Sequence, residues 1–355
     1  MSNVSIRQCL HDLPKCEHHL HIEGSLSPNL LFRLASINEI ALPSAEADSS
    51  FASPEALEDR YTRFTSLNDF LQYYYIGMSV LITTGDFESL AYEYFTRAHD
   101  DGVHHAEIFF DPQAHTSRGI AYETVVTGFG AAQKRAEKDF GLTSKLILCF
   151  LRHLPASDAE DTYRAAEALG HFSSGVVAGI GLDSSEVGFP PELFREVYEF
   201  ASRSGVRRTA HAGEEGDSTY ISRALDLCNT ERIDHGIRLV DDEVLLKRVA
   251  KSKILVTMCP LSNVRLKCVT KVAELPVRKF LDEGVRFSIN SDDPAYFGGY
   301  ILDNYVAVQE AFDLSLKEWK FIADGAIEGS WCDGDRKKVL LEKVEQWSKA
   351  YEGTL

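Results

Sequence analysis

Residues 177–213 read VAGIGLDSSEVGFPPELFREVYEFASRSGVRRTAHAG and contain two short apolar runs on either side of an amphipathic segment. The runs at 177–183 and 207–213 have the length and composition of buried strands. The segment between them starts at Pro191 and has apolar residues at helical spacing, and proline is favoured in the first turn of a helix. This order of elements predicts a right-handed βαβ unit with two parallel strands.

The same alternation continues along most of the chain. Short β-rich runs occur near residues 16–21, 105–111, 145–152, 177–183, 207–213, 231–235, 254–259 and 285–291. Eight strands in 355 residues match a closed (β/α)8 barrel, whose active site lies at the carboxyl ends of its strands. We therefore expect residues 1–355 to form one α/β domain, a TIM barrel with extra helices after the first strand and at the C-terminus.

The segment from 24 to 104, between the first two strands, is long for a barrel connection. It contains a loop-like stretch at 41–50 and an aromatic-rich helical pattern at 64–75. We expect helices here that lie over the barrel mouth as a lid. The alternative is that the aromatic pattern is only the packing face of a core helix, formed by Phe64, Leu67, Phe70, Leu71 and Tyr74. Beyond residue 305 the chain predicts terminal helices on the barrel exterior.

Composition and charge argue against several classes of partner. The formal net charge is −17, whereas nucleic-acid binders neutralise phosphates with clustered lysine and arginine. No apolar run is long enough to span a membrane, and the first residues lack the apolar region of a secretion signal. Seven cysteines without framework spacing fit reduced thiols in the cytoplasm or nucleus. We expect a small-molecule ligand, and neither a nucleic-acid nor a membrane partner.

Histidines and a carboxylate lie at the ends of several predicted strands. His19 and His21 are two residues apart, which places both imidazoles on one face of an extended strand. The other members of the set are His211, His235 and Asp292. Imidazoles and a carboxylate from separate strand ends are what a buried divalent metal with an open coordination position requires. The sequence therefore predicts a metallo-hydrolase.

Neighbouring groups add acid–base chemistry to this set. Glu214 follows the third histidine after two small residues, and burial could raise its pKa enough for it to donate a proton. His235 is open to three interpretations, as a general base, a fourth ligand or a core histidine. Asp292 and Asp293 form an acidic pair after the last strand, where like charges favour a metal or one retained proton. The alternative for either aspartate is a helix N-cap, since Pro294 could begin a helix.

One class of zinc enzyme is excluded by a missing motif. His21-Ile-Glu23 matches the His-x-Glu half of the cytidine-deaminase zinc signature, which also requires Pro-Cys-x-x-Cys. The sequence contains no Pro-Cys dipeptide, so this signature is incomplete.

Four motifs together resemble the adenosine/adenine deaminase family of metallo-dependent hydrolases. They are His-x-His at 19–21, His-Ala-Gly-Glu at 211–214, Asp-His-Gly at 234–236 and Ser-x-Asn-Ser-Asp-Asp-Pro at 288–294. Longer blocks, at 13–25, 110–119 and 291–299, are similar to the fungal and bacterial adenine deaminases. Order and spacing agree from Pro14 to about Tyr300, and the long blocks are specific where a lone His-x-His is weak.

The resemblance implies one Zn²⁺ per chain, held by His19, His21, His211 and Asp292. Such an ion lowers the pKa of a water molecule toward about 7. In the family, the residue at the position of His235 orients and deprotonates that water.

The resemblance also implies how a purine is bound and what happens to it. Glu214 would protonate the ring nitrogen beside the carbon that carries the amine, and Asp293 would contact the imidazole-side nitrogen. Ser184 stands where related nucleoside enzymes have a glycine whose backbone contacts the ring. The implied reaction is hydrolytic deamination of adenine to hypoxanthine and ammonia, a step of purine salvage.

Glu23 is the position that favours adenine over adenosine. Adenosine deaminases typically carry aspartate there, where it meets a ribose hydroxyl, and glutamate is one methylene longer. Its carboxylate would occlude the sugar and could bond the N9 side of a free base. Adenosine deaminase is the alternative function, and an AMP-acting enzyme is disfavoured because no basic cluster accompanies the motifs. A catalytically silent metal-binding scaffold is disfavoured because it needs neither Glu214 nor His235.

Overall fold

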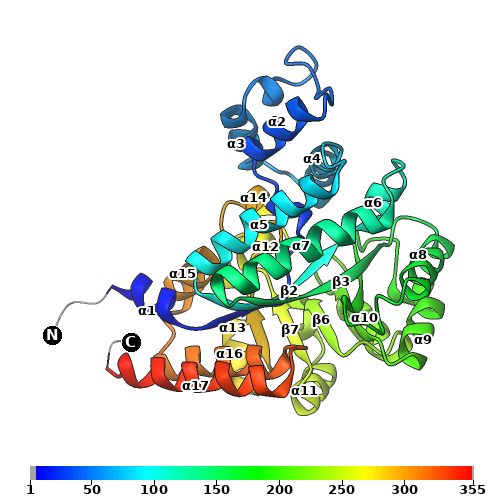
Figure 1. Ribbon diagram of the computed structural model, residues 1–355. Helices are drawn as coiled ribbons and strands as arrows, with labels where there is room; N and C mark the ends of the chain where they lie inside the picture. Colours follow the sequence, from blue (N-terminus) through cyan, green and yellow to red (C-terminus); the bar gives the residue numbers. More distant parts are fainter. Residues whose placement is uncertain (1–4, 354–355) are drawn as a thin grey trace.

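Eight parallel strands form the centre of the molecule (Figure 1). The computed structural model describes residues 5–353. The strands are β1 (Lys15–Glu17), β2 (Val103–Phe110), β3 (Thr143–Leu151), β4 (Val177–Asp183), β5 (Arg207–Ala212), β6 (Arg232–His235), β7 (Leu255–Met258) and β8 (Phe287–Ile289). They pair in the order of the sequence. Beyond β8, Asp292 N–H donates to His19 O and His21 N–H donates to Asp292 O, each at 3.0 Å. The segments that follow β8 and β1 therefore meet, and the barrel is nearly closed.

The predicted (β/α)8 architecture is confirmed, and all eight strands lie at or near their expected positions. The expected helix from Pro191 begins as a short 3-10 helix, η3 (Pro191–Phe194), and continues as α9 (Arg195–Arg203). The largest difference concerns β1, which ends at Glu17 instead of residue 21. From His18 onward the chain leaves the regular ladder, and isolated bridges join Leu20 to Asp292, beyond the end of β8, and His21 to Phe109 of β2.

Helices between the strands form the outer layer. Those that follow a strand or cover the barrel wall are α5 (Thr84–Asp100), α7 (Tyr122–Phe140), α8 (Ala156–Ala168), α9, α10 (Ser218–Leu227), η4 (Ile237–Asp241), α11 (Glu243–Ser252), η5 (Val272–Glu274) and α13 (Val277–Glu283). Short helices α6 (Pro112–Thr116), α12 (Pro260–Arg265) and α14 (Pro294–Phe297) come soon after β2, β7 and β8. Each begins with proline, which cannot donate to a strand ladder and suits the first helical turn. Asp111 and Asp293, directly before two of these prolines, are thereby held at strand ends.

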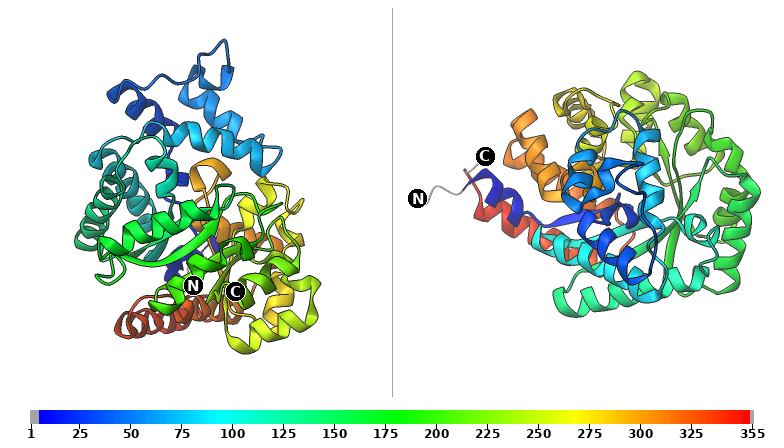
Figure 2. Two further views of the ribbon diagram at one scale, coloured as in Figure 1. Left: turned by 90° about the vertical axis from the view of Figure 1, so that its right-hand side faces the viewer. Right: turned by 90° about the horizontal axis from the view of Figure 1, so that it is seen from above.

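The long segment after β1 forms extra helices over the barrel mouth. It contains η1 (Glu23–Ser25), α2 (Pro28–Ile37), η2 (Ser49–Ala52), α3 (Pro54–Tyr61) and α4 (Leu67–Met78). Figure 1 shows α2, α3 and α4 at one end of the barrel, and in the right-hand view of Figure 2 the same segment overlies its centre. By contrast α5, which falls within the 24–104 segment, packs along β2 and α7 as an outer helix of the barrel.

The ends of the chain cover the exterior of the barrel, as expected for the C-terminal helices. The elements are α1 (Ile6–Asp12), α15 (Ile301–Phe312), α16 (Leu316–Gly329) and α17 (Gly334–Ala350). Helix α16 packs against β1, β7 and β8, and α17 packs against α16. Across residues 5–353, no helix combines the length and the apolar character needed to cross a membrane.

Candidate active site

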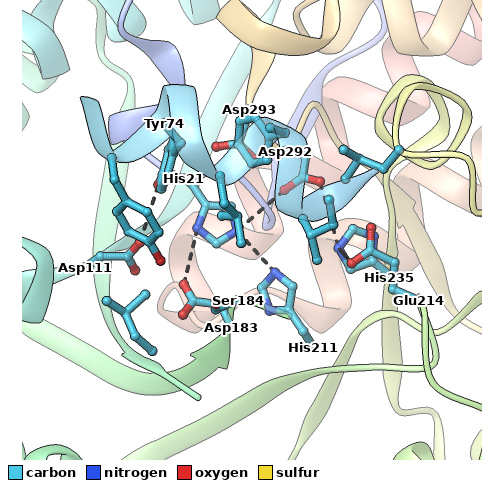
Figure 3. A pocket seen from close by; sticks show the side chains of 16 residues that line it. His21, Tyr74, Asp111, Asp183, Ser184, His211, Glu214, His235, Asp292 and Asp293 are labelled. Atoms are coloured by element: carbon cyan, nitrogen blue, oxygen red, sulfur yellow. Dashed lines mark hydrogen bonds and ion pairs between the residues drawn. The ribbon is translucent and has the colours of Figure 1, made fainter. Parts of the chain in front are cut away.

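Four side chains expected to bind a metal converge at the carboxyl ends of the strands. His19 and His21 follow β1, His211 lies in β5, and Asp292 follows β8. His21 Nε2 lies 3.1 Å from His211 Nε2 and 3.5 Å from Asp292 Oδ1. His19 Nε2 lies 3.2 Å from the same carboxylate oxygen. One donor atom from each residue falls within 4.8 Å of every other, and all four residues are buried. Figure 3 shows His21, His211 and Asp292 of this cluster.

The outward nitrogens of the three imidazoles face polar groups outside the cluster. His19 Nδ1 lies 2.9 Å from Thr257 Oγ1, which donates to Asp234 Oδ1 at 2.9 Å, and Asp234 Oδ2 lies 3.8 Å from His211 Nδ1. Asp183 Oδ2 lies 3.5 Å from His21 Nδ1. Each Nε2 therefore points to the centre of the cluster, where His19 Nε2 has no hydrogen-bond partner within residues 5–353. This arrangement fits a metal ion, because partners on Nδ1 orient an imidazole and leave Nε2 to coordinate.

The protonation states also fit a cation at this point. Burial lowers the pKa of His21 and lowers that of His211 further, and the neutral imidazole is the form that binds metals. Burial alone would raise the pKa of Asp292, but the nearby imidazoles, His19 first, bring it below its usual range. Ser262 Oγ donates to Asp292 Oδ2 at 2.6 Å and leaves Oδ1 directed at the cluster. His21 and His211 therefore offer neutral nitrogen donors, and Asp292 offers a carboxylate.

His235 and Glu214 lie together beside this cluster (Figure 3). His235 Nε2 lies 3.5 Å from Glu214 Oε2 and 3.8 Å from Asp292 Oδ2, and Asn263 Nδ2 lies 3.2 Å from His235 Nδ1. Burial lowers the pKa of His235 well below its ordinary value. Burial, and then the charge of Asp292, raises the pKa of Glu214 well above its usual range. A protonated carboxyl next to a neutral imidazole provides one proton donor and one acceptor.

Backbone strain marks the same region. His235 has a φ of 60° and Asp292 a φ of 65°. Left-handed conformations are uncommon for residues other than glycine and cluster at functional sites, where the surrounding fold imposes them. The strain therefore coincides with the two residues whose side chains meet beside Glu214.

Asp293 directs its carboxylate toward the pocket. It occupies the N-cap position of α14, but its side chain makes no capping hydrogen bond. Its buried Oδ1 has no partner in the described part of the chain, and the residue lines the pocket. A Cβ added to Gly24 would lie 2.0 Å from that oxygen, so glycine is needed for the close approach. The N-cap alternative thus accounts for the backbone position of Asp293 and leaves its carboxylate free for a ligand.

Ser184 and Glu23, both candidate substrate contacts, occupy different positions relative to the pocket. Ser184 lines it and has a φ of 70°, a conformation that favours glycine, and its Oγ lies 2.9 Å from His153 Nδ1. Glu23 is buried behind the wall. Its Oε1 accepts a hydrogen bond from Asp111 N–H at 3.2 Å and lies 3.0 Å from His115 Nε2. Glu23 therefore supports the turn after β2 and is not part of the pocket lining given by residues 5–353.

The pocket above the cluster opens to solvent, and together with the adjoining solvent it comprises about 410 Å³ of space not filled by protein atoms. Helix α4 supplies much of its apolar wall, with Leu67, Phe70, Leu71, Tyr74 and Tyr75. Leu67, Phe70 and Tyr74 are also buried, so one face of α4 both packs and lines the pocket.

Two further carboxylates line the pocket that sequence reasoning did not identify. Asp111 follows β2 and Asp183 ends β4. Burial, and then the charge of Glu23, raises the pKa of Asp111, while burial, and then the charge of Asp111, raises the pKa of Asp183 well above its usual range. A signal for them was present, because each is an acidic residue at the end of a predicted strand, where a barrel places its active site.

Comparisons with known proteins agree with this geometry. A family model described as adenosine deaminase matches residues 14–347. The chain is 59% identical to an adenine deaminase of Schizosaccharomyces pombe over 351 residues, which are 99% of this chain and 95% of that relative. The crystal structure of an adenine deaminase from Arthrobacter aurescens is 45% identical with a TM-score of 0.89, covering 95% of this chain and 99% of that one. An amidohydrolase from Burkholderia ambifaria, solved with bound Zn, is 26% identical with a TM-score of 0.83, covering 98% and 96% of the two chains. The chain therefore belongs to the adenosine deaminase family, a family of metal-dependent deaminases.

Proposed function

We propose that this protein is an adenine deaminase, which hydrolyses adenine to hypoxanthine and ammonia. The observation that carries the proposal is the meeting of an acid and a base beside a metal ligand set. Glu214 Oε2 and His235 Nε2 lie 3.5 Å apart next to Asp292, and all three line one pocket. The 59% identity to an adenine deaminase over nearly the whole chain supports the choice of substrate.

Zinc is the metal that suits the ligand set, with one ion per chain. His19, His21, His211 and Asp292 would hold it. Three neutral imidazoles and one carboxylate are typical of zinc sites, and such a set leaves room for one further ligand. When bound, zinc lowers the pKa of a water molecule and so provides a nucleophile near neutral pH.

His235 and Glu214 would move the protons of the reaction. His235 Nε2 takes a proton from the water that attacks the purine carbon carrying the amine. Glu214, protonated because burial raises its pKa, gives its proton to the adjacent ring nitrogen and makes that carbon more electrophilic. The proton held by His235 leaves with the amine as ammonia, the remaining hydroxyl proton of the added water returns to Glu214, and the oxygen stays on the ring as the keto group of hypoxanthine.

The pocket favours a planar, uncharged ligand. Asp293 would bond the imidazole side of the purine, and the backbone at Ser184 would contact the ring. The wall from α4 is apolar and aromatic, and the lining given by residues 5–353 includes no lysine or arginine. A nucleotide phosphate would therefore lack a counter-charge, which disfavours AMP. Glu23 would act on the end of the pocket that a sugar would occupy, through the turn after β2 that it supports.

Kinetics on three substrates test this proposal. Zinc-loaded protein is expected to release ammonia from adenine with a kcat/KM at least about 100-fold higher than from adenosine, and to leave AMP unchanged. Glu214→Gln and His235→Ala should each lower kcat by about 10² to 10⁴-fold with zinc content retained. Glu196→Gln, which removes an exposed carboxylate of α9 outside the pocket lining, is the control with wild-type turnover. Preference for adenosine, or full turnover by Glu214→Gln, would contradict the proposal.

A further inference from the structure

A second acidic group lies in the pocket away from the acid and the base. Figure 3 shows Glu214 and His235 together at one side, Asp111 at the other, and Asp183 between them beside His21. Asp111 is 1% exposed and Asp183 is 2% exposed. Asp111 Oδ1 and Asp183 Oδ1 have no hydrogen-bond partner among the described residues, Asp183 Oδ2 faces His21 Nδ1 at 3.5 Å, and both residues line the pocket. Buried acceptors without partners, directed at a cavity, indicate a ligand that brings hydrogen-bond donors.

A second metal ion is a poor occupant for this group. Asp111, Asp183 and His21 place donor atoms within 4.8 Å of one another. However, His21 directs Nε2 at Asp292 and His211 in the first cluster, and only its Nδ1 faces Asp183. A neutral imidazole has one free lone pair, so it cannot serve both positions. The remaining two carboxylates are too few protein ligands for a closed metal site.

The shape of a purine places a particular edge of the ring at these carboxylates. The carbon that loses its amine must lie near Glu214 and His235, and the N7 side must lie near Asp293. The N9 edge, at the far end of the bicyclic ring, then faces Asp111 and Asp183. In a free purine base this edge carries an N–H donor, whereas in a nucleoside it carries the sugar carbon.

We propose that Asp111, with Asp183 beside it, accepts the N–H hydrogen bond at the N9 edge of an unsubstituted purine and thereby selects free bases over nucleosides. This inference rests on the proposed function and names the residues that determine its substrate. A substituent at N9 removes the donor, leaves buried carboxylate oxygens unpaired and collides with them. Sites that require a hydrogen bond reject an analogue without it by about 10⁴ to 10⁵-fold.

The structure holds Asp111 in place for this contact. Tyr74 O–H donates to Asp111 Oδ2 at 3.4 Å, and Glu23 Oε1 accepts from the Asp111 backbone N–H at 3.2 Å. Only Asp111 Oδ1 is left for a ligand. Glu23 is therefore a positioning residue, which acts on substrate choice through the turn that carries Asp111.

The test compares adenine with 9-methyladenine in zinc-loaded protein. We expect the wild type to prefer adenine in kcat/KM by at least about 10³-fold. Asp111→Ala should lower kcat/KM for adenine and not for 9-methyladenine, so that the preference falls at least tenfold. Asp111→Asn keeps the shape and one acceptor but loses the charge, and its preference should fall by about tenfold. Asp111→Asn provides the test if Asp111→Ala does not fold. Asp101→Ala is the control, because Asp101 is a buried carboxylate that does not line the pocket. It should keep the wild-type preference for adenine over 9-methyladenine.

Binding measurements separate this inference from the proposed function. Calorimetry with hypoxanthine and 9-methylhypoxanthine gives the same preference as a ratio of Kd values, without turnover. Wild-type protein that leaves adenine unchanged contradicts the proposed function, while a binding preference that falls in Asp111→Asn still supports the N–H contact. An unchanged preference in the Asp111 variants, or an equal loss for both ligands, overturns the inference. Two metal ions per wild-type chain, with one lost in Asp111→Ala, overturn it as well.

Discussion

Replacing Gly24 with alanine should reduce activity sharply, although the change adds only one methyl group. The new Cβ would lie 2.7 Å from the Cα of Asp293 and 2.0 Å from its Oδ1. Non-bonded carbons stay about 3.5 Å apart, so the two backbones must separate by about 0.8 Å. Rotation of the Asp293 side chain would relieve the contact with Oδ1 but not the contact between the new Cβ and the Asp293 Cα. The displacement therefore changes the position of Asp293 and of its neighbour Asp292 relative to the other groups of the pocket.

A shift of this size should lower kcat/KM for adenine by about 10²-fold, since misplacing a reacting or binding group by about 1 Å has that effect. The measurement is steady-state deamination, with zinc content and Tm recorded on the same preparation. Gly130→Ala in α7 is the matched control, because no atom lies within 4 Å of its added Cβ. It should keep wild-type activity and gain roughly 0.5–1 kcal/mol in helix stability. A Gly24→Ala variant with full zinc and kcat/KM within about twofold of wild type would refute the reasoning.

Three further predictions concern the metal, a buried ion pair and a helix end. Removing the metal with a chelator should abolish turnover and lower Tm, and added zinc should restore both. Free zinc at 100 times its Kd should stabilise the folded state by about 2.7 kcal/mol. An unchanged Tm would contradict a metal held by the folded state. Arg232 and Glu107 form a fully buried ion pair, and Arg232→Ala should lower the free energy of unfolding by about 3–5 kcal/mol in urea melts. Burial would raise the pKa of Glu107, but Arg232 brings it below its usual range. The stability that the ion pair contributes is therefore present above about pH 4.3 and is lost as the pH falls toward the pKa of the folded state. Glu107→Gln should accordingly make the free energy of unfolding depend less on pH in this acidic range. Lys253 caps the C-terminal end of α11 with a φ of 54°, a conformation that favours glycine. Lys253→Gly should therefore raise the free energy of unfolding by up to about 1 kcal/mol with no change in kcat. A thermal melt would measure this rise.

The barrel was predictable because its signals are local. Buried parallel strands appear as short apolar runs, and the helices between them have their own periodicity. The register of β1 was not predictable in the same way. Its regular ladder ends at Glu17 because His18 N–H bonds the Asn290 side chain at 2.8 Å, a contact between residues far apart in the chain.

The candidate site was predictable in its metal-binding half and less so in its substrate-binding half. Histidines at strand ends are rare enough to be noticed, and the barrel brings strand ends together. Asp111 and Asp183 have the same placement, but acidic residues are common in this chain, so a carboxylate at a strand end is less conspicuous than a histidine. Glu23 was expected to contact the substrate, whereas its carboxylate lies behind Asp111.

Sequence alone was sufficient for the fold class and the family, because periodicity and motif spacing are properties of short segments. The positions of Asp111, Asp183, Asp293 and Glu23 relative to one cavity followed only from the tertiary structure. A cavity is bounded by segments that are distant in sequence, and a few ångströms of packing determine whether a carboxylate faces a ligand or a neighbouring backbone. Gly24 illustrates the point, since its role depends on the approach of Asp293 from the far end of the barrel.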